Sequence, residues 1–77
     1  MGKKKNQLKK EIEKSREEIE NLEHKLSRSQ VAIIEAIITQ KKPSDTDIDY
    51  FRTYAQLIEV ERENLQSLTA ELKELDK

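Results

Sequence analysis

The chain has 77 residues, of which 40% are charged and 34% hydrophobic, with one Gly, one Pro, no Cys and a net charge of −1. This length allows one small domain with a limited core, and the lack of Cys excludes disulfides and thiol chemistry. No run approaches the roughly 18 continuous apolar residues that cross a bilayer, and no apolar segment follows the basic start. We therefore expect a cytoplasmic protein that does not enter a membrane.

The N-terminal segment is strongly basic. The first ten residues contain five Lys and no acidic residue, whereas residues 44–77 contain nine acidic and four basic residues. We predict that residues 1–5 form a basic, frayed tail. Weak binding of nucleic acid through this Lys-rich end is an alternative function, but no second basic surface supports it.

A first helix is predicted over about residues 6–41. Its apolar residues recur with alternating spacings of four and three, which is the heptad pattern of a helix that packs along one seam. Ser15 and Ser29 interrupt this pattern, and we interpret them as allowing close approach of the neighbouring helix. The apolar seam positions of this helix are Leu8, Ile12, Ile19, Leu22, Leu26, Ile33 and Ala36.

A loop is predicted at about residues 42–44. Pro43 disfavours helical backbone at Lys42 and so ends the first helix. Ser44 or Thr46 can cap the next helix, since each is followed by an acidic residue in a capping-box-like spacing. A short connection between two long helices predicts that they pack antiparallel.

A second helix is predicted over about residues 45–75. Its seam has one polar interruption, Glu61, which is either a register device or a side chain that reaches out to solvent. The other seam positions are Phe51, Tyr54, Ile58, Leu65, Leu68, Leu72 and Leu75.

The two seams and the loop together predict a register for the hairpin. If facing residues have numbers that add to 87, apolar seam residues oppose each other along most of the length, and Leu26 faces Glu61. The same register places Glu23 beside Arg62. The fold class predicted is therefore all-α, an antiparallel, coiled-coil-like two-helix hairpin that forms a four-helix bundle by dimerisation.

Near the loop the first helix is apolar almost all round, which a single hairpin cannot bury. We interpret the apolar residues outside the seam as an interface with a partner. The favoured partner is a second copy, giving a dimer, and the alternative is a different helical protein. The predicted interface residues are Val31, Ile34, Ile38, Tyr50, Leu57 and Val60.

No grouping of side chains suggests catalysis. The single His, His24, has Glu20 one turn before it, but a metal site requires three or four converging ligands. The chain has no Gly-rich phosphate loop, no Cys nucleophile and no Ser/His/Asp arrangement. We predict a non-enzymatic protein with no catalytic site, no metal and no cofactor.

One family resemblance starts from the segment Pro43–Leu68. A loop rich in capping residues leads into Asp49-Tyr50-Phe51-Arg52-Thr53-Tyr54-Ala55-Gln56-Leu57-Ile58-Glu59, followed by a Leu-bearing helix. This segment resembles the small E-component co-chaperones of type III secretion systems, which are helical hairpins. The resemblance spans about a third of the chain, contains no diagnostic motif, and departs in the higher charge and longer first helix. It implies that the chain keeps a needle subunit soluble by binding it through the apolar surface near the loop.

A second resemblance is limited to five residues. The stretch Ala55-Gln56-Leu57-Ile58-Glu59 is similar to the Ser-Gln-x-Leu-Asp motif of sporulation-type aspartyl-phosphate phosphatases, which are also small hairpins. It lacks both the Ser and the Asp of that motif, so the resemblance implies no phosphatase activity.

Overall fold

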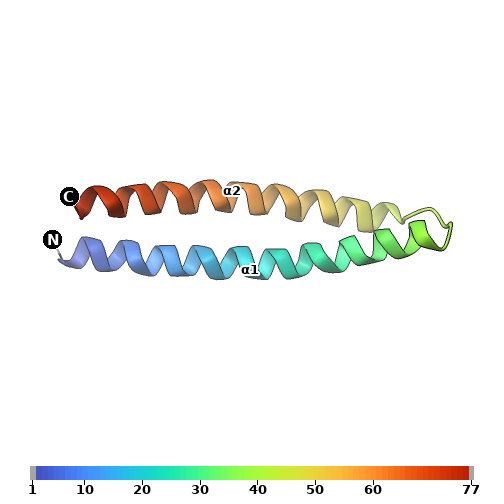
Figure 1. Cartoon of the computed structure of the whole chain (residues 1–77), viewed down its shortest axis with the longest axis horizontal. Coiled ribbons are helices and arrows are strands. Elements are labelled where there is room, and N and C mark those ends of the chain that lie inside the picture. The colour runs from blue at the N-terminus through green and yellow to red at the C-terminus, as the bar shows by residue number, and fades with distance from the viewer. Residues whose placement is uncertain (1, 77) are drawn as a thin grey trace.

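The computed structural model describes residues 2–76, which form two long helices joined by one loop (Figure 1). α1 runs over Gly2–Ile38 and α2 over Asp45–Leu75, with no strand in the described part of the chain. The helices lie side by side in opposite directions and form a rod of 58 × 16 × 14 Å. This confirms the predicted all-α antiparallel hairpin, whereas its association into a four-helix bundle stays a prediction.

The N-terminal segment is helical, which corrects the prediction of a frayed tail and of a helix start near residue 6. Lys is a good helix former, and the ammonium group of Lys5 pairs with the Asp76 carboxylate just after α2. This ion pair joins the first turns of α1 to the acidic end of α2, while the side chains of Lys3 and Lys4 are exposed. The predicted tail also included Met1, which lies outside the described residues.

The C-terminal end of α1 also differs from the prediction. The helix ends at Ile38 rather than at 41, so the loop covers residues 39–44 instead of 42–44. The backbone turns into the left-handed region at Gln40, with φ 60°. Because this turn precedes Pro43, the helix has already ended before the proline is reached.

The turn at Gln40 is a Schellman motif. The Lys41 N–H donates to the Ala36 carbonyl at 2.7 Å, and the Gln40 N–H donates to the Ile37 carbonyl at 3.1 Å. The Thr39 hydroxyl donates to the Glu35 carbonyl at 2.8 Å. These bonds satisfy carbonyl groups that have no partner within the helix, which is why the last turn is well closed without a glycine.

α2 begins where the capping pattern predicts. Ser44 has extended backbone, and its hydroxyl accepts a hydrogen bond from the Asp47 N–H at 3.1 Å. Asp45 and Asp47 lie in the first turn, where the positive end of the helix dipole favours acidic side chains. The observed range of α2 matches the predicted 45–75.

The two helices pack in a register about one heptad away from the predicted one. The numbers of the residues in four side-chain contacts between the helices add to 76, 79, 81 and 85, an average of about 80, whereas the prediction was 87. Leu26 therefore does not face Glu61. The predicted proximity of Glu23 and Arg62 is confirmed by an ion pair at 3.6 Å. The four contacts are Ser15–Glu61, Lys25–Tyr54, Lys5–Asp76 and Glu23–Arg62.

The heptad repeat explains why the predicted register can differ from the observed one by seven residues. Both seams repeat every seven residues, so a slip of one heptad still places apolar seam against apolar seam. Leu8 reports the observed register, because it is only 5% exposed although the predicted register leaves nothing opposite it in α2. Leu75 is 41% exposed rather than buried against Ile12, because in the observed register it lies level with Lys5.

The core is a single layer between the helices and is concentrated away from the loop. Its buried members are Leu8, Ile12, Ser15, Ile19, Leu22, Ser29 and Ile58. Of the other apolar seam positions, Leu75 is exposed and the rest are half-buried, namely Leu26, Ile33, Ala36, Phe51, Tyr54, Leu65, Leu68 and Leu72. No described side chain is completely buried. The loop-proximal third of the rod is therefore the least well packed part of the molecule.

Candidate protein-binding surface

All six predicted interface residues are exposed in the hairpin. The exposed fractions are 51% for Val31, 45% for Ile34, 74% for Ile38, 51% for Tyr50, 46% for Leu57 and 63% for Val60. Ile37, which was not among the predicted interface residues, is also 61% exposed. Because large apolar side chains in contact with water favour association, these residues form the candidate protein-binding surface.

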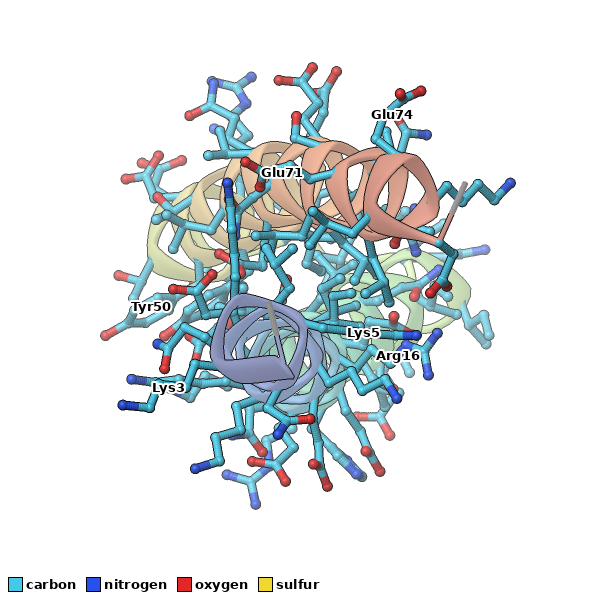
Figure 2. All side chains as sticks on the ribbon, turned by 90° about the vertical axis from the view of Figure 1, so that its left-hand side faces the viewer. Lys3, Lys5, Arg16, Tyr50, Glu71 and Glu74 are labelled. Carbon is cyan, nitrogen blue, oxygen red and sulfur yellow. The ribbon has the colours of Figure 1, made fainter. Side chains whose placement is uncertain are left out.

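The exposed apolar residues lie on two different flanks of the hairpin. One shallow groove between the helices is lined by Lys25, Arg28 and Tyr50, and another by Glu23, Gln30 and Arg62. Figure 2, seen along the rod, places Tyr50 and Arg16 on opposite sides. Arg16 belongs to the same heptad row of α1 as Glu23 and Gln30, so the two grooves run along opposite flanks.

We call the first of these surfaces the isoleucine flank. It consists of Val31, Ile34, Ile37 and Ile38, which lie on α1. Ile37 is seven residues after Gln30 and continues its row, and Ile34 is seven residues after Ser27, which lines the same groove. Ile48, near the start of α2, is half-buried.

The isoleucine flank belongs to an uncharged stretch of the outer surface of α1. From residue 27 to residue 38, the three heptad rows on this flank and on the back of α1 contain no charged side chain. The preceding members of the same rows, Glu20, Glu23 and His24, are charged or titratable. The six residues of the stretch are Ser27, Gln30, Val31, Ile34, Ile37 and Ile38.

We call the second surface the tyrosine flank. It consists of Tyr50, Tyr54, Leu57 and Val60, which lie on α2. The rings of Tyr50 and Tyr54 are stacked with centroids 5.9 Å apart and planes 10° apart. The Lys25 ammonium lies 5.8 Å from the Tyr54 ring centroid, a cation–π contact between the helices. This flank is therefore partly occupied by contacts within the hairpin itself.

A polar contact crosses the seam in the half of the rod away from the loop. The Ser15 hydroxyl, which is 3% exposed, donates to Glu61 Oε1 at 2.7 Å, and Asn64 Nδ2 donates to the same oxygen at 3.3 Å. Sequence reasoning missed this contact, because the predicted register placed Ser15 opposite Leu72. The available signal was that each seam has a polar interruption that an apolar partner would leave unsatisfied.

The structure does not bring together a set of metal-ligating side chains among residues 2–76. His24 borders a shallow groove with Glu18, Asn21, Lys25 and Arg28. Neither described helix contains an apolar stretch long enough to span a membrane.

Comparison of the chain with family models, with curated proteins and with solved structures found no match. The features of the hairpin that bear on its function are the two exposed flanks and the packing between the helices.

Proposed function

We propose that this hairpin is a non-enzymatic protein-interaction module that associates with a second copy of itself or with another helical protein. The observation that carries the proposal is the exposure of seven large apolar side chains in the half of the rod that contains the loop. They are Val31, Ile34, Ile37, Ile38, Tyr50, Leu57 and Val60.

The total exposed surface area of the hairpin supports the proposal that part of this surface binds a partner. A compact monomer of 9.1 kDa exposes about 4,900 Å² by the usual scaling of surface with mass. The hairpin exposes 6429 Å², an excess of roughly 1,500 Å². A stable protein–protein interface of standard size removes about 800 Å² from each partner. The hairpin therefore has enough surplus surface for a stable complex with one or two neighbours.

The distribution of the core supports the same proposal. The buried seam residues of α1 end at Ser29, and the later seam residues Ile33 and Ala36 are only half-buried. Apolar side chains on the outside of this same region are the most exposed ones. A partner that covers them would add a second layer where the hairpin is least well packed.

The experiment is light scattering over a concentration series from micromolar to millimolar, together with circular dichroism. We expect reversible association that is weakened by the double variant Ile34→Glu/Leu57→Glu, which places one charge on each flank. The matched control Asn21→Glu/Gln56→Glu adds the same charges at exposed polar positions and should associate like the original chain. A fully helical monomer at every concentration, with a melting temperature independent of concentration, would exclude self-association.

The resemblance to type III secretion co-chaperones stays a prediction. A helical client would use the same exposed flanks, so no contact in the hairpin favours it over a second copy. The outcome that favours a client is a chain that is poorly helical or aggregates when purified alone and becomes helical when a candidate needle subunit is added.

A further inference from the structure

We propose that the isoleucine flank binds the isoleucine flank of a second copy in an antiparallel arrangement, with the loop ends overlapping and the chain termini pointing apart. This inference rests on the proposed function and specifies its partner, its surface and its geometry. Three features of the described residues carry it: the shape of the uncharged stretch, the charges at its two ends, and the contrast with the tyrosine flank.

The uncharged stretch suits a two-fold symmetric contact. It runs from Ser27 to Ile38, and its midpoint lies between Ala32 and Ile33. A two-fold axis through this point and perpendicular to α1 places uncharged residues of one copy against uncharged residues of the other along the whole stretch. Ile34 then lies near Val31 of the second copy, and Ser27 lies near its Ile38.

The charges at the two ends of the stretch select the antiparallel direction. Glu20 and Glu23 precede the stretch, and Lys41 and Lys42 follow it. In the antiparallel arrangement the lysines of one copy lie beside the turn that carries the glutamates of the other, which is an attractive pairing at both ends. A parallel arrangement places each of these charges beside the same residue of the other copy, and like charges at an interface oppose association.

The charges on the remainder of α1 also favour the antiparallel arrangement. In a parallel pair the full length of α1 would face its copy, which brings Lys9, Lys10 and Arg16 of one chain near the same residues of the other. The antiparallel overlap involves only the loop-proximal third, so these cations lie at opposite ends of the assembly. It therefore buries the apolar residues while keeping these cations of the two copies apart.

The tyrosine flank is less suited to this role. Tyr54 is stacked on Tyr50 and covered by Lys25, and the groove beside them is also lined by Arg28 and Asp47. Burying that flank would remove water from these charged groups, whereas the four residues of the isoleucine flank are uncharged and the charged residues beside them, Glu35 and Lys41, border the groove at Ile38. We therefore assign the second copy to the isoleucine flank.

The first test compares the two flanks by light scattering of the full chain. The double variant Ile34→Glu/Ile38→Glu should raise the dimer dissociation constant by about 100-fold or more, because both copies lose apolar burial and gain a desolvated charge. The matched double variant Leu57→Glu/Val60→Glu should change it by less than about threefold. The opposite ranking would overturn the assignment of the flank while leaving the proposed interaction function intact.

The second test measures the orientation. The chain has no Cys, so a single spin label at Glu17→Cys reports one distance between two copies. A helical rise of about 1.5 Å per residue predicts a label separation of roughly 45 Å in the antiparallel overlap. A parallel pair would give a separation below roughly 20 Å, because packed helices are about 8–10 Å apart. The short distance would overturn the antiparallel orientation. A chain that stays monomeric at millimolar concentration would overturn the proposal that the partner is a second copy.

Discussion

At the scale of single residues, the least expected feature is a polar contact within an apolar seam. Ser15 is almost completely buried, and its hydroxyl donates to a Glu61 carboxylate that is only half-buried. Glu61 therefore keeps part of its hydration, while Ser15 has its hydrogen bond satisfied inside the protein. A contact of this kind adds little net stability but disfavours registers in which either group would face an apolar side chain.

The substitution Ser15→Ala tests this contact. It removes the buried donor to Glu61 and should lower the free energy of unfolding by about 1 kcal/mol in urea denaturation. Replacing both partners, as Ser15→Ala/Glu61→Leu, should restore the stability of the original chain or exceed it, because neither position then places a polar group in the seam. A double variant that is less stable than Ser15→Ala alone would contradict this account.

At the scale of secondary-structure elements, the two ends of the loop are closed in different ways. Ser44 caps α2 through its side chain, whereas α1 is closed by backbone hydrogen bonds around Gln40. The left-handed backbone at Gln40 is strained for a residue with a Cβ atom, and glycine is the residue usually found there. The helix end is thus defined by hydrogen bonding in spite of an unfavourable residue.

The Gln40→Gly variant should be more stable than the original chain by up to about 1 kcal/mol, because glycine adopts φ 60° without steric cost. Thermal unfolding at a fixed protein concentration measures this difference. Gln40→Ala is the matched control and should give no comparable gain, since alanine retains the Cβ atom. Equal melting temperatures for the two variants would show that backbone strain at Gln40 does not limit stability.

Replacing the residue that caps α2 should lower the stability of the hairpin. Ser44→Ala removes the acceptor for the Asp47 N–H and should lower the free energy of unfolding by about 1 kcal/mol. Ser44→Asp keeps an acceptor at the same position and should retain most of the stability, as judged by urea denaturation. A Ser44→Asp variant as unstable as Ser44→Ala would argue against the capping role.

At the scale of the whole molecule, the register of α1 against α2 decides which side chains are buried. It places Leu8 in the core at 5% exposure and leaves Leu75 exposed at 41%, the reverse of the ranking in the predicted register. The same register leaves the isoleucine flank without a partner in the hairpin. The register therefore decides which seam residues stabilise the hairpin, whereas the residues of the isoleucine flank lie outside the seam in both registers.

Comparing Leu8→Ala with Leu75→Ala tests the register directly. Leu8→Ala should lower the free energy of unfolding by about 2 kcal/mol or more, because it opens space in a buried layer. Leu75→Ala should cost less than about 1 kcal/mol, since its side chain is already partly in water. Urea denaturation of both variants at equal concentration gives the ranking. The reversed order would support the register in which facing residue numbers add to 87.

The sequence by itself determined the helical periods, the position of the loop, the cap at Ser44 and the residues left outside the seams. These features are local, because they depend on spacing within one helix or on hydrogen bonds between near neighbours. The end of α1 was misplaced, since the sequence pattern favoured Pro43 and gave no glycine at the residue that makes the left-handed turn.

Only the tertiary structure decided the register and the separation of the exposed residues into two flanks. A seam that repeats every seven residues packs nearly as well after a slip of one heptad, so its apolar pattern cannot distinguish the two registers. The Ser15–Glu61 and Lys5–Asp76 contacts distinguish them, and each depends on residues more than 40 positions apart. Likewise, Ile34 and Leu57 both lie outside a seam in the sequence pattern, and only the packing of α1 on α2 places them on opposite flanks.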